Sequence, residues 1–410
     1  MSHGELSARD AQAPASAPPS VSSAQPGAVL LYVVNVSWFF LSHRLPLARA
    51  ALAAGYEVHL ASDLEDEAET QALEEAGITF HRVRIARSGL SPFGELRCLG
   101  ELHGIVRRVR PTIVHNVTAK PVVYGTRVAR ALGTRGIVNA ISGFGHVYGG
   151  GARRRWLRGL LDLAYRGSFS PDNVRIVVQN AADRAEVLRL CPGAAARLRL
   201  IPGSGVDLRQ FLPAAEPGGT ATVVLPARVL REKGIYEFAA AADTLRRAGV
   251  AARFVVAGRL DPANRSALTR GELATLCART PIEWLGDCKD MPRCLREANI
   301  VCLPSYYREG VPKVLLEACA AGRAIVTTDW PGCRDVVAHE RNGLLVPPRD
   351  PVALAAAIRR LLEDDALRQR LALAGRARAE REFAIEQVVA SHLELYRELR
   401  GNHGPVPARV

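Results

Sequence analysis

The sequence predicts an α/β protein made of two doubly wound, Rossmann-like domains that face a central cleft. Three observations support this prediction. Short apolar, β-branched segments alternate with amphipathic helical segments, the alternation breaks once in a Gly- and Pro-rich stretch, and it then restarts with a new first strand. Apolar strands separated by helices indicate parallel sheets covered on both faces. A length of 410 residues also exceeds what one hydrophobic core usually supports.

The first half of the chain is predicted to form an N-terminal domain over residues 28–202. It follows a tail, residues 1–27, whose Ala, Pro, Ser and Gln content predicts disorder and which lacks the apolar core of a secretory signal. The predicted strands are 29–34, 56–61, 78–83, 112–116, 136–141 and 174–179, and helical segments between them include 44–54, 65–76 and 121–132.

Residues 203–221 are dense in Gly and Pro and are predicted to be the linker. A C-terminal domain is expected over 222–384, followed by a helix over 385–400 that packs back across the domains. The stretch 350–400 is helical throughout, with breaks near Asp365 and Phe383. The predicted strands of this half are 222–227, 252–258, 282–286, 300–304 and 324–329. Ligands of such sheets bind at the carboxyl ends of the strands, so the cleft is the expected site.

Composition indicates a cytoplasmic protein that is able to associate with the inner face of the cell membrane. The strongest apolar run near the start, residues 29–41, is too short to span a bilayer. The eight cysteines form no C-x-x-C pair and several lie in apolar runs, which favours free thiols in a reducing compartment over a disulfide or zinc framework.

Positive charge is concentrated in one segment. Residues 97–199 hold 18 Arg and Lys against 5 Asp and Glu, an excess equal to the net charge of +13 of the whole chain. This pattern fits an anionic partner such as lipid headgroups or a diphosphate, and it equally fits an Arg-rich solvated surface. Within it, residues 153–166 predict a basic amphipathic helix, suited either to an anionic membrane or to ordinary packing on the sheet.

The most informative stretch lies in the second domain, where the apolar strand 300–304 is followed by a polar loop and Pro312. Proline is favoured where a helix begins, so free amides of Gly310 and Val311 are expected at a positive helix end, an arrangement that suits a diphosphate. Glu309 and Glu317 bracket this helix start. Carboxylates only accept hydrogen bonds, so they suit sugar or ribose hydroxyls.

A second element opens the same domain. Arg228 follows the strand 222–227, and Lys233 comes five residues later, just ahead of a helix. Two cations at the carboxyl end of a strand are suited to clamping a diphosphate leaving group. Gly258, at the end of the next strand, is predicted to allow close approach of a ligand or simply to form a turn.

These motifs resemble those of the family 4 retaining glycosyltransferases of GT-B fold. The resemblance rests on R-x4-K after the first strand of the second domain, on IEWLG and on EGVPKVLLEACAAGRAIVTTDWPGCRDVV, and it covers about residues 28–400. In the first half, NVSWFFLSHR, HNVTAKPVVYG and NAISGFGHVY resemble bacterial transferases acting on undecaprenyl-diphosphate-linked glycans. Many relatives carry a glycine-rich loop where this chain has NVSWFFLSHR, which puts donor contact from that loop in question.

The resemblance implies retaining transfer of a hexosyl or N-acetylhexosaminyl unit from a UDP-sugar to a lipid-diphosphate-linked or polysaccharide acceptor in cell-surface glycan biosynthesis. It implies no cofactor besides the UDP-sugar co-substrate, and no metal. Arg228 and Lys233 would hold the diphosphate and Glu309 the transferred sugar. The implied donor-binding residues are Gly258, Trp284, Leu285, Asp287, Gly310, Val311, Lys313 and Glu317, with Glu317 on the ribose and Trp284–Asp287 beside the base.

The acceptor is expected against the first domain. His115 and Asn116 end one predicted strand, Lys120 lies just beyond, and Gly143 lies in the segment 142–145 that ends the next strand. The strand-end rule places all four in the cleft. A histidine in such a place is more often structural than catalytic, so His115 is not assigned as a base. His43 and Arg44 are further candidates.

Two other functions remain open from the sequence. A UDP-sugar 2-epimerase shares the two-domain architecture but needs acid and base carboxylates at the sugar. A non-enzymatic RNA-binding protein would use the basic segment, yet no RNP, KH or helix-turn-helix signature is present, so no nucleic-acid partner is predicted.

Overall fold

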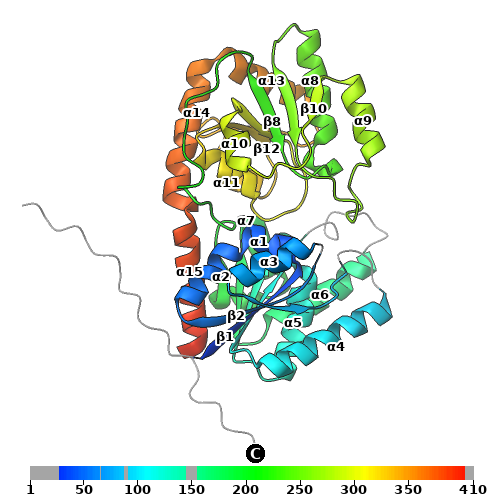
Figure 1. The fold of residues 1–410 in the computed structure, drawn as a ribbon, viewed down its shortest axis with the longest axis vertical. Helices are drawn as coiled ribbons and strands as arrows, with labels where there is room; N and C mark the ends of the chain where they lie inside the picture. Colours follow the sequence, from blue (N-terminus) through cyan, green and yellow to red (C-terminus); the bar gives the residue numbers. More distant parts are fainter. Residues whose placement is uncertain (1–26, 65, 87–90, 145–154, 402–410) are drawn as a thin grey trace, which may run out of the picture.

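Two parallel β-sheets form two domains stacked one on the other (Figure 1). The computed structural model describes residues 27–401 except 65, 87–90 and 145–154, and only the backbone of 155–157. Each sheet separates two clusters of buried apolar side chains, so both faces of each sheet are covered. The predicted fold class is thereby confirmed.

The N-terminal sheet has the strand order β3-β2-β1-β4-β5-β6-β7. Alternate residues of β1 face opposite sides, with Leu31 and Val33 in one cluster and Leu30 and Tyr32 in the other. The order reverses between β1 and β4, which places a topological switch point at their carboxyl ends. The strands are β1 Ala28–Val36, β2 Tyr56–Asp63, β3 Thr79–Arg82, β4 Ile113–Val117, β5 Gly136–Ile141, β6 Val174–Val178 and β7 Leu198–Leu200.

The helices of this domain mostly connect successive strands. They are α1 Ser37–His43, α2 Leu45–Ala53, α3 Glu67–Glu75, α4 Pro92–Val109, α5 Ala119–Ala131, α6 Arg155–Phe169 and α7 Ala181–Leu190, followed by the 3-10 turn η3 Pro192–Arg197. The short edge strand β7 was not predicted, because three residues are too few to show an alternating pattern.

The C-terminal sheet repeats the arrangement with the order β10-β9-β8-β11-β12-β13. Its strands are β8 Thr222–Pro226, β9 Arg253–Ala257, β10 Ile282–Trp284, β11 Ile300–Leu303, β12 Ala324–Thr328 and β13 Leu344–Val346. Its helices are η4 Arg231–Lys233, α8 Ile235–Arg247, α9 Arg270–Arg279, α10 Met291–Arg296, α11 Lys313–Ala320, α12 Cys333–Val336, α13 Pro351–Glu363 and α14 Asp365–Arg378. Strand β13 was not predicted either, because its three residues, like those of β7, show no alternating pattern.

The chain returns to the N-terminal domain at its end. After α14, the π-helical turn η5 (Ala379–Phe383) leads into α15 (Ile385–Gly401), and both long helices run along one side of the two domains (Figure 1). Helix α15 packs against α2 and β5. Its Tyr396 hydroxyl lies 2.9 Å from the Tyr32 hydroxyl and 2.6 Å from His115 Nδ1. The last helix therefore completes the core of the first domain.

Two further sequence expectations concern the cysteines and the membrane. All eight cysteines are free. Within the described part of the chain, we find no helix that has both the length and the apolar character needed to cross a bilayer.

The interior beneath α15 holds histidines that stay uncharged in the folded protein. His115 and His392 are both fully buried. Burial, together with the positive charge of Arg44, lowers the pKa of His392 from 6.5 to about 3, and burial holds the pKa of His115 well below its ordinary value. Unfolding exposes both rings to water, where they accept protons below about pH 6.5.

We therefore expect the free energy of unfolding to fall as the pH drops from 7 towards 4, by about 1.4 kcal/mol per pH unit for each such histidine. The unfolded chain binds the extra protons, so stability is present above the unfolded pKa and is lost below it. Urea unfolding of the wild type and of His392→Gln at several pH values measures the difference, in which carboxylate effects cancel. Parallel pH profiles of the two proteins would contradict the prediction.

Candidate functional site

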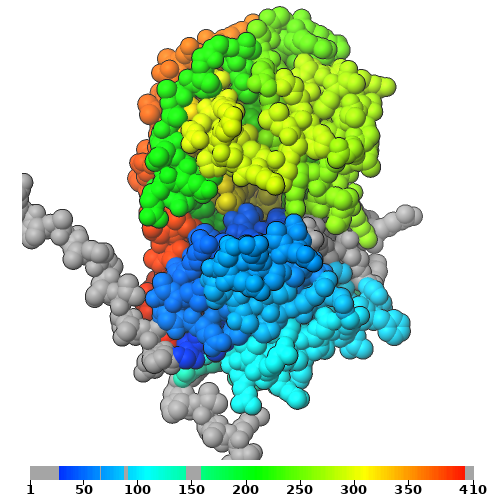
Figure 2. Space-filling view, viewed as in Figure 1, coloured from blue at the N-terminus to red at the C-terminus, as the bar shows by residue number. Residues whose placement is uncertain are grey.

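A cleft of about 310 Å³ lies between the two domains and is lined by residues of both. Figure 2 shows the surface hollowed between the upper domain and the blue N-terminal segment. The first domain contributes the end of β1, the start of α1, the junction of α1 with α2, and residues that follow β4, β5 and β6. The second contributes Arg228, residues 263–265, and the loop 307–311 with Lys313.

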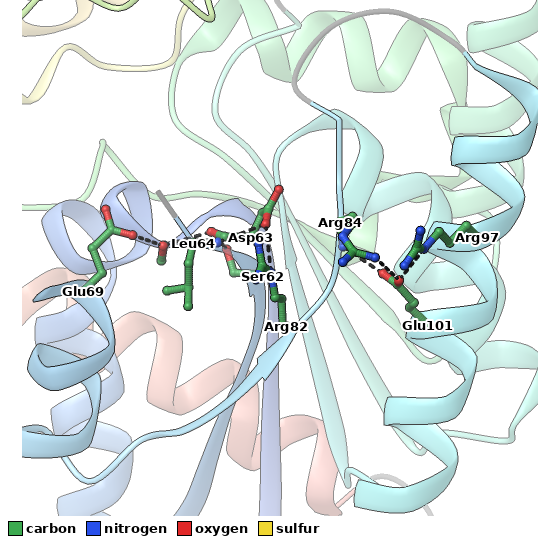
Figure 3. Close-up of polar contacts among 9 residues, drawn as sticks. Ser62, Asp63, Leu64, Glu69, Arg82, Arg84, Arg97 and Glu101 are labelled. Carbon is green, nitrogen blue, oxygen red and sulfur yellow. Dashed lines mark hydrogen bonds and ion pairs between the residues drawn. The ribbon is translucent and has the colours of Figure 1, made fainter. Parts of the chain in front are cut away.

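Helix α1 begins directly after β1, without an intervening loop. A contact at the end of β2 holds its start in place, because Ser37 Oγ donates to the Asp63 carbonyl at 2.9 Å. The Asp63 carboxylate in turn lies 3.7 Å from Arg82 at the end of β3 (Figure 3). Trp38 is thereby presented to the second domain. The guanidinium carbons of Arg259 and Arg228 lie 4.4 and 5.4 Å from its ring centroid, within cation–π range.

The loop before α11 is held by the first domain. The Gly310 amide donates to the Ser142 carbonyl at 3.1 Å, and the Val311 amide donates to Gln179 Oε1 at 2.9 Å. A Cβ at Gly310 would overlap Gln179 Oε1, so a larger residue there would displace the Gln179 side chain. The expectation that these two amides are free is therefore wrong for this arrangement of the domains, because first-domain acceptors occupy the positions predicted for phosphate oxygens.

The two predicted carboxylates both carry cationic partners. Glu309 lines the cleft and forms an ion pair with Lys233, which lies behind it and is buried. Lys313 lines the cleft and forms an ion pair of 2.8 Å with Glu317, which is only 5% exposed. In each pair one residue lines the cleft, Glu309 or Lys313, and its partner does not.

Arg228 reaches the cleft from the end of β8 and is held by buried Asp261 at 2.6 Å. Gly258 has a different role from close ligand approach, because a Cβ there would overlap the Ala227 carbonyl on the neighbouring strand end. Trp284 Nε1 donates to the Gly258 carbonyl at 2.8 Å, and Leu285 is 59% exposed. Trp284, Leu285 and Asp287 are not among the residues that line the cleft.

The predicted positions of His115 and Asn116 in the cleft are wrong. Strand β4 continues to Val117, so both side chains lie inside the first domain and are fully buried. His115 is bonded to Tyr396, and Asn116 Nδ2 donates to Asn139 Oδ1 at 2.9 Å. The residue of this segment that does line the cleft is Thr118.

The other two acceptor-side candidates also have structural partners. Lys120 forms an ion pair of 2.6 Å with Glu95 of α4 and is not among the residues that line the cleft. Gly143 has a φ of 93°, and a Cβ there would lie 2.6 Å from backbone atoms of Arg308 and Glu309. Gly143 therefore permits close backbone contact between the domains. Gly145 lies outside the described residues.

Several cleft residues escaped the sequence analysis. Gln179 directly follows β6, so the strand-end rule would have found it, but it was assigned to the strand itself. Ser142, by contrast, belongs to the segment 142–145 that was predicted to lie in the cleft, and it does line it. Asn264 and Arg265 carried no signal, because their places in the cleft depend on how the domains meet.

Positive charge dominates the cleft. Burial, followed by the charges of Lys313 and Arg44, lowers the pKa of His43 to about 3, so this ring is neutral at physiological pH. Among the described residues that line the cleft, Glu309 is the one carboxylate, and it is paired with Lys233. Across the described ranges, no three His, Cys, Asp or Glu side chains are grouped so that they could hold a metal ion.

Comparison with protein families agrees with this geometry. Residues 220–364 match the family described as Glycosyl transferases group 1, and residues 29–170 match the family described as Glycosyl transferase 4-like. The two matches fall on the two halves that form the cleft. The chain belongs to the glycosyltransferases. The resemblance seen in the sequence motifs is thereby confirmed.

Individual relatives of this glycosyltransferase carry the names of transferases and synthases that act on sugars. It is 26% identical over 355 residues to the N,N'-diacetylbacillosaminyl-diphospho-undecaprenol alpha-1,3-N-acetylgalactosaminyltransferase of Campylobacter jejuni, a match that spans 81% of this chain and 91% of the relative. It is 27% identical to a glycogen synthase of Mycobacterium tuberculosis, over 64% of each chain.

Solved structures share the fold at low sequence identity. Sucrose-phosphate synthase from Thermosynechococcus elongatus has a TM-score of 0.75 at 20% identity, over 92% of this chain and 100% of that one. Anabaena HepE, solved in complex with UDP and glucose, has a TM-score of 0.70 at 15% identity, over 90% of this chain and 99% of that one.

The contact at Gly143 leads to a testable prediction. We expect Gly143→Ala to lower the free energy of unfolding by about 1 to 2 kcal/mol through backbone strain at positive φ, and by about 1 to 3 kcal/mol more through the clash with residues 308–309. Gly133→Ala is the matched control, because Gly133 has a φ of 69° with nothing near its Cβ position. Equal melting temperatures for the two variants would contradict the domain contact.

Proposed function

We propose that this glycosyltransferase transfers a hexosyl or N-acetylhexosaminyl unit from a UDP-sugar, with retention of configuration, to a lipid-diphosphate-linked or polysaccharide acceptor in cell-surface glycan biosynthesis. The observation that carries the proposal is the charge of the cleft. Arg228, Lys313 and Arg44 reach it from both domains, and its carboxylate Glu309 is already paired. Such a cleft is complementary to a diphosphate.

The transition state of glycosyl transfer places negative charge on the departing diphosphate and positive charge on the sugar. Arg228 is fixed by Asp261, so it is already oriented before the substrate arrives. Preorganised cations of this kind stabilise a developing anion without further rearrangement. Glu309 is placed to accept hydrogen bonds from sugar hydroxyls, and its ion pair with Lys233 fixes its position.

A donor diphosphate would compete for the amides of Gly310 and Val311. These amides now donate to Ser142 and Gln179 of the first domain. Binding of phosphate oxygens at the same place would require the two domains to separate slightly or the Gln179 side chain to turn away. Opening and closing of a cleft around a donor is a common way to exclude water from transfer reactions.

The relatives support the substrate classes of the proposal. The Campylobacter jejuni relative is named as an N-acetylgalactosaminyltransferase acting on a diphospho-undecaprenol-linked sugar, and the match spans most of both chains. HepE, similar in fold, was crystallised with UDP-glucose. These observations favour a UDP-sugar donor and a lipid-linked acceptor over the epimerase and RNA-binding alternatives.

A membrane-facing surface on the first domain would give access to such an acceptor. Large apolar side chains are exposed near the start of α4, where Phe93 is 87% and Leu96 70% exposed, and on α6, where Leu160 is 57% and Leu163 67% exposed. Both helices flank α5. We propose that this surface associates with anionic membrane from the cytoplasmic side. The arginines at 153 and 154, part of the same predicted helix, lie outside the described residues.

We expect Arg228→Ala to lower turnover with the UDP-sugar by about 100-fold, because one preorganised donor to the leaving group is lost. A thermal-shift panel of UDP-Glc, UDP-Gal, UDP-GlcNAc, UDP-GalNAc and GDP-Man first identifies the donor. Arg231→Ala is the matched control, since Arg231 pairs with Glu272 and is not among the residues that line the cleft. Wild-type turnover in Arg228→Ala would remove the proposed leaving-group site, and conversion of the UDP-sugar without acceptor would indicate an epimerase.

We expect the protein to sediment with anionic liposomes at low salt and to be released at high salt, because counterions screen surface charge. Leu160→Ser with Leu163→Ser should weaken sedimentation. Leu373→Ser is the control, because Leu373 is 72% exposed but lies on α14 of the other domain. Equal sedimentation with neutral liposomes would argue against the electrostatic contribution.

A further inference from the structure

Four arginines are buried in the described part of the chain, and three of them have clear partners. Arg323 donates to the carbonyl oxygens of Leu295, Arg296 and Ala215 at 2.9, 3.2 and 3.3 Å. Arg368 pairs with Glu216 at 2.7 Å, and Arg175 pairs with Glu398 at 3.1 Å. Arg44 is the exception. It is 2% exposed, its Nε has no hydrogen-bond partner, and its guanidinium forms no ion pair with any described residue.

Arg44 lines the cleft from the first domain. It is the single residue between α1 and α2, where its φ of −125° and ψ of −15° turn the chain from one helix to the next. This turn places it, with His43, among the residues that line the cleft. The unpartnered guanidinium is therefore not sealed in the core but borders the space that a substrate would enter.

The surroundings of Arg44 do not compensate its charge. Burial lowers the pKa of the guanidinium, and only the hydroxyls of Tyr32 and Tyr396 act against this. Burial also raises the pKa of both tyrosines far above the physiological range, so neither supplies a negative charge. Glu309, the carboxylate of the cleft, is paired with Lys233.

A buried, uncompensated cation is costly, and a guanidinium cannot escape the cost by losing its proton. Neither of the carboxylates that hold the nearby cleft cations Lys313 and Arg228 is left over for Arg44, because Glu317 is paired with Lys313 and Asp261 with Arg228. The missing partner must therefore be an anion that enters from the cleft. A guanidinium matches phosphate oxygens in geometry and charge better than any neutral hydroxyl does.

We propose that Arg44 is the phosphate-binding residue of the first domain, and that its guanidinium is neutralised by a phosphoryl group of a bound substrate. The proposal rests on the proposed function and extends it to the opposite wall of the cleft. The phosphoryl group can belong to the donor diphosphate or to the diphosphate of a lipid-linked acceptor. Both present the same oxygens, so the test must separate them.

The proposal makes a prediction about stability that a structural role does not share. If Arg44 awaits a ligand, Arg44→Met removes an unpaired buried charge, so the melting temperature of the ligand-free protein should stay the same or rise. Arg323→Met serves as the comparison, since it leaves three carbonyl acceptors without their donor and should lower the melting temperature.

The full-length wild type, Arg44→Met and Arg44→Lys are compared by titration with sodium pyrophosphate, UDP and the active UDP-sugar. Kinetics follow with a prenyl-diphosphate-linked sugar and with an uncharged alkyl glycoside of the same sugar as acceptors. We expect Arg44→Met to lose at least about tenfold in pyrophosphate affinity and Arg44→Lys to recover part of it.

Comparing the change in UDP affinity with the change in acceptor KM shows whether the phosphoryl group belongs to the donor or to the acceptor. A loss of UDP affinity with an unchanged KM for the lipid-linked acceptor assigns Arg44 to the donor. An unchanged UDP affinity, with loss of the preference for the diphosphate-linked acceptor over the alkyl glycoside, assigns it to the acceptor.

The proposal is overturned if Arg44→Met lowers the ligand-free melting temperature as Arg323→Met does while leaving pyrophosphate affinity and both KM values unchanged. This outcome differs from failure of the proposed function. If the wild type binds no UDP-sugar, the proposed function fails, and the pyrophosphate titration and the melting temperatures still decide the role of Arg44.

Discussion

One close backbone contact between the two domains lies beside the cleft and shapes it. Gly143 of the first domain meets the backbone of residues 308–309, and beside it the amides of Gly310 and Val311 donate to Ser142 and Gln179. A side chain at Gly143 would push the two segments apart, because its Cβ would meet the backbone of residues 308–309. This contact brings the residues after β5 and β6 against the start of α11, and so defines the cleft.

Three charged side chains that line the cleft are held in ion pairs. Arg228 is held by Asp261, Glu309 by Lys233 and Lys313 by Glu317, so each group has a fixed position before a substrate binds. Pairing of this kind lowers the cost of keeping ions in a partly buried place and orients them. Arg44 has no such partner among the described residues, which makes it the position where a substrate changes the electrostatics most.

The return of the chain through α15 connects the cleft to the stability of the first domain. Tyr396 contacts Tyr32 and His115 in the layer next to Arg44. The histidines of this layer remain neutral because burial disfavours their charged form. A second domain that ends in a helix on the first domain also limits how far the two can move apart, since η5 and α15 connect them directly.

The sequence by itself determined the fold class, eleven of the thirteen strands in the described part of the chain and the residues that begin α11, because strand and helix patterns are local and repeat along the chain. It also identified Arg228, Glu309 and Lys313, which follow strand ends of one domain. Only the tertiary structure decided that His115 and Asn116 are buried, that Gly258 serves strand packing, and that Gln179 borders the cleft. Arg44 was already a candidate from its position after the first strand, and the structure places it in the cleft. The physical reason is that a partner across two domains or on a distant helix leaves no periodic signal: Tyr396 is 281 residues from His115, and Gln179 is 132 residues from Val311.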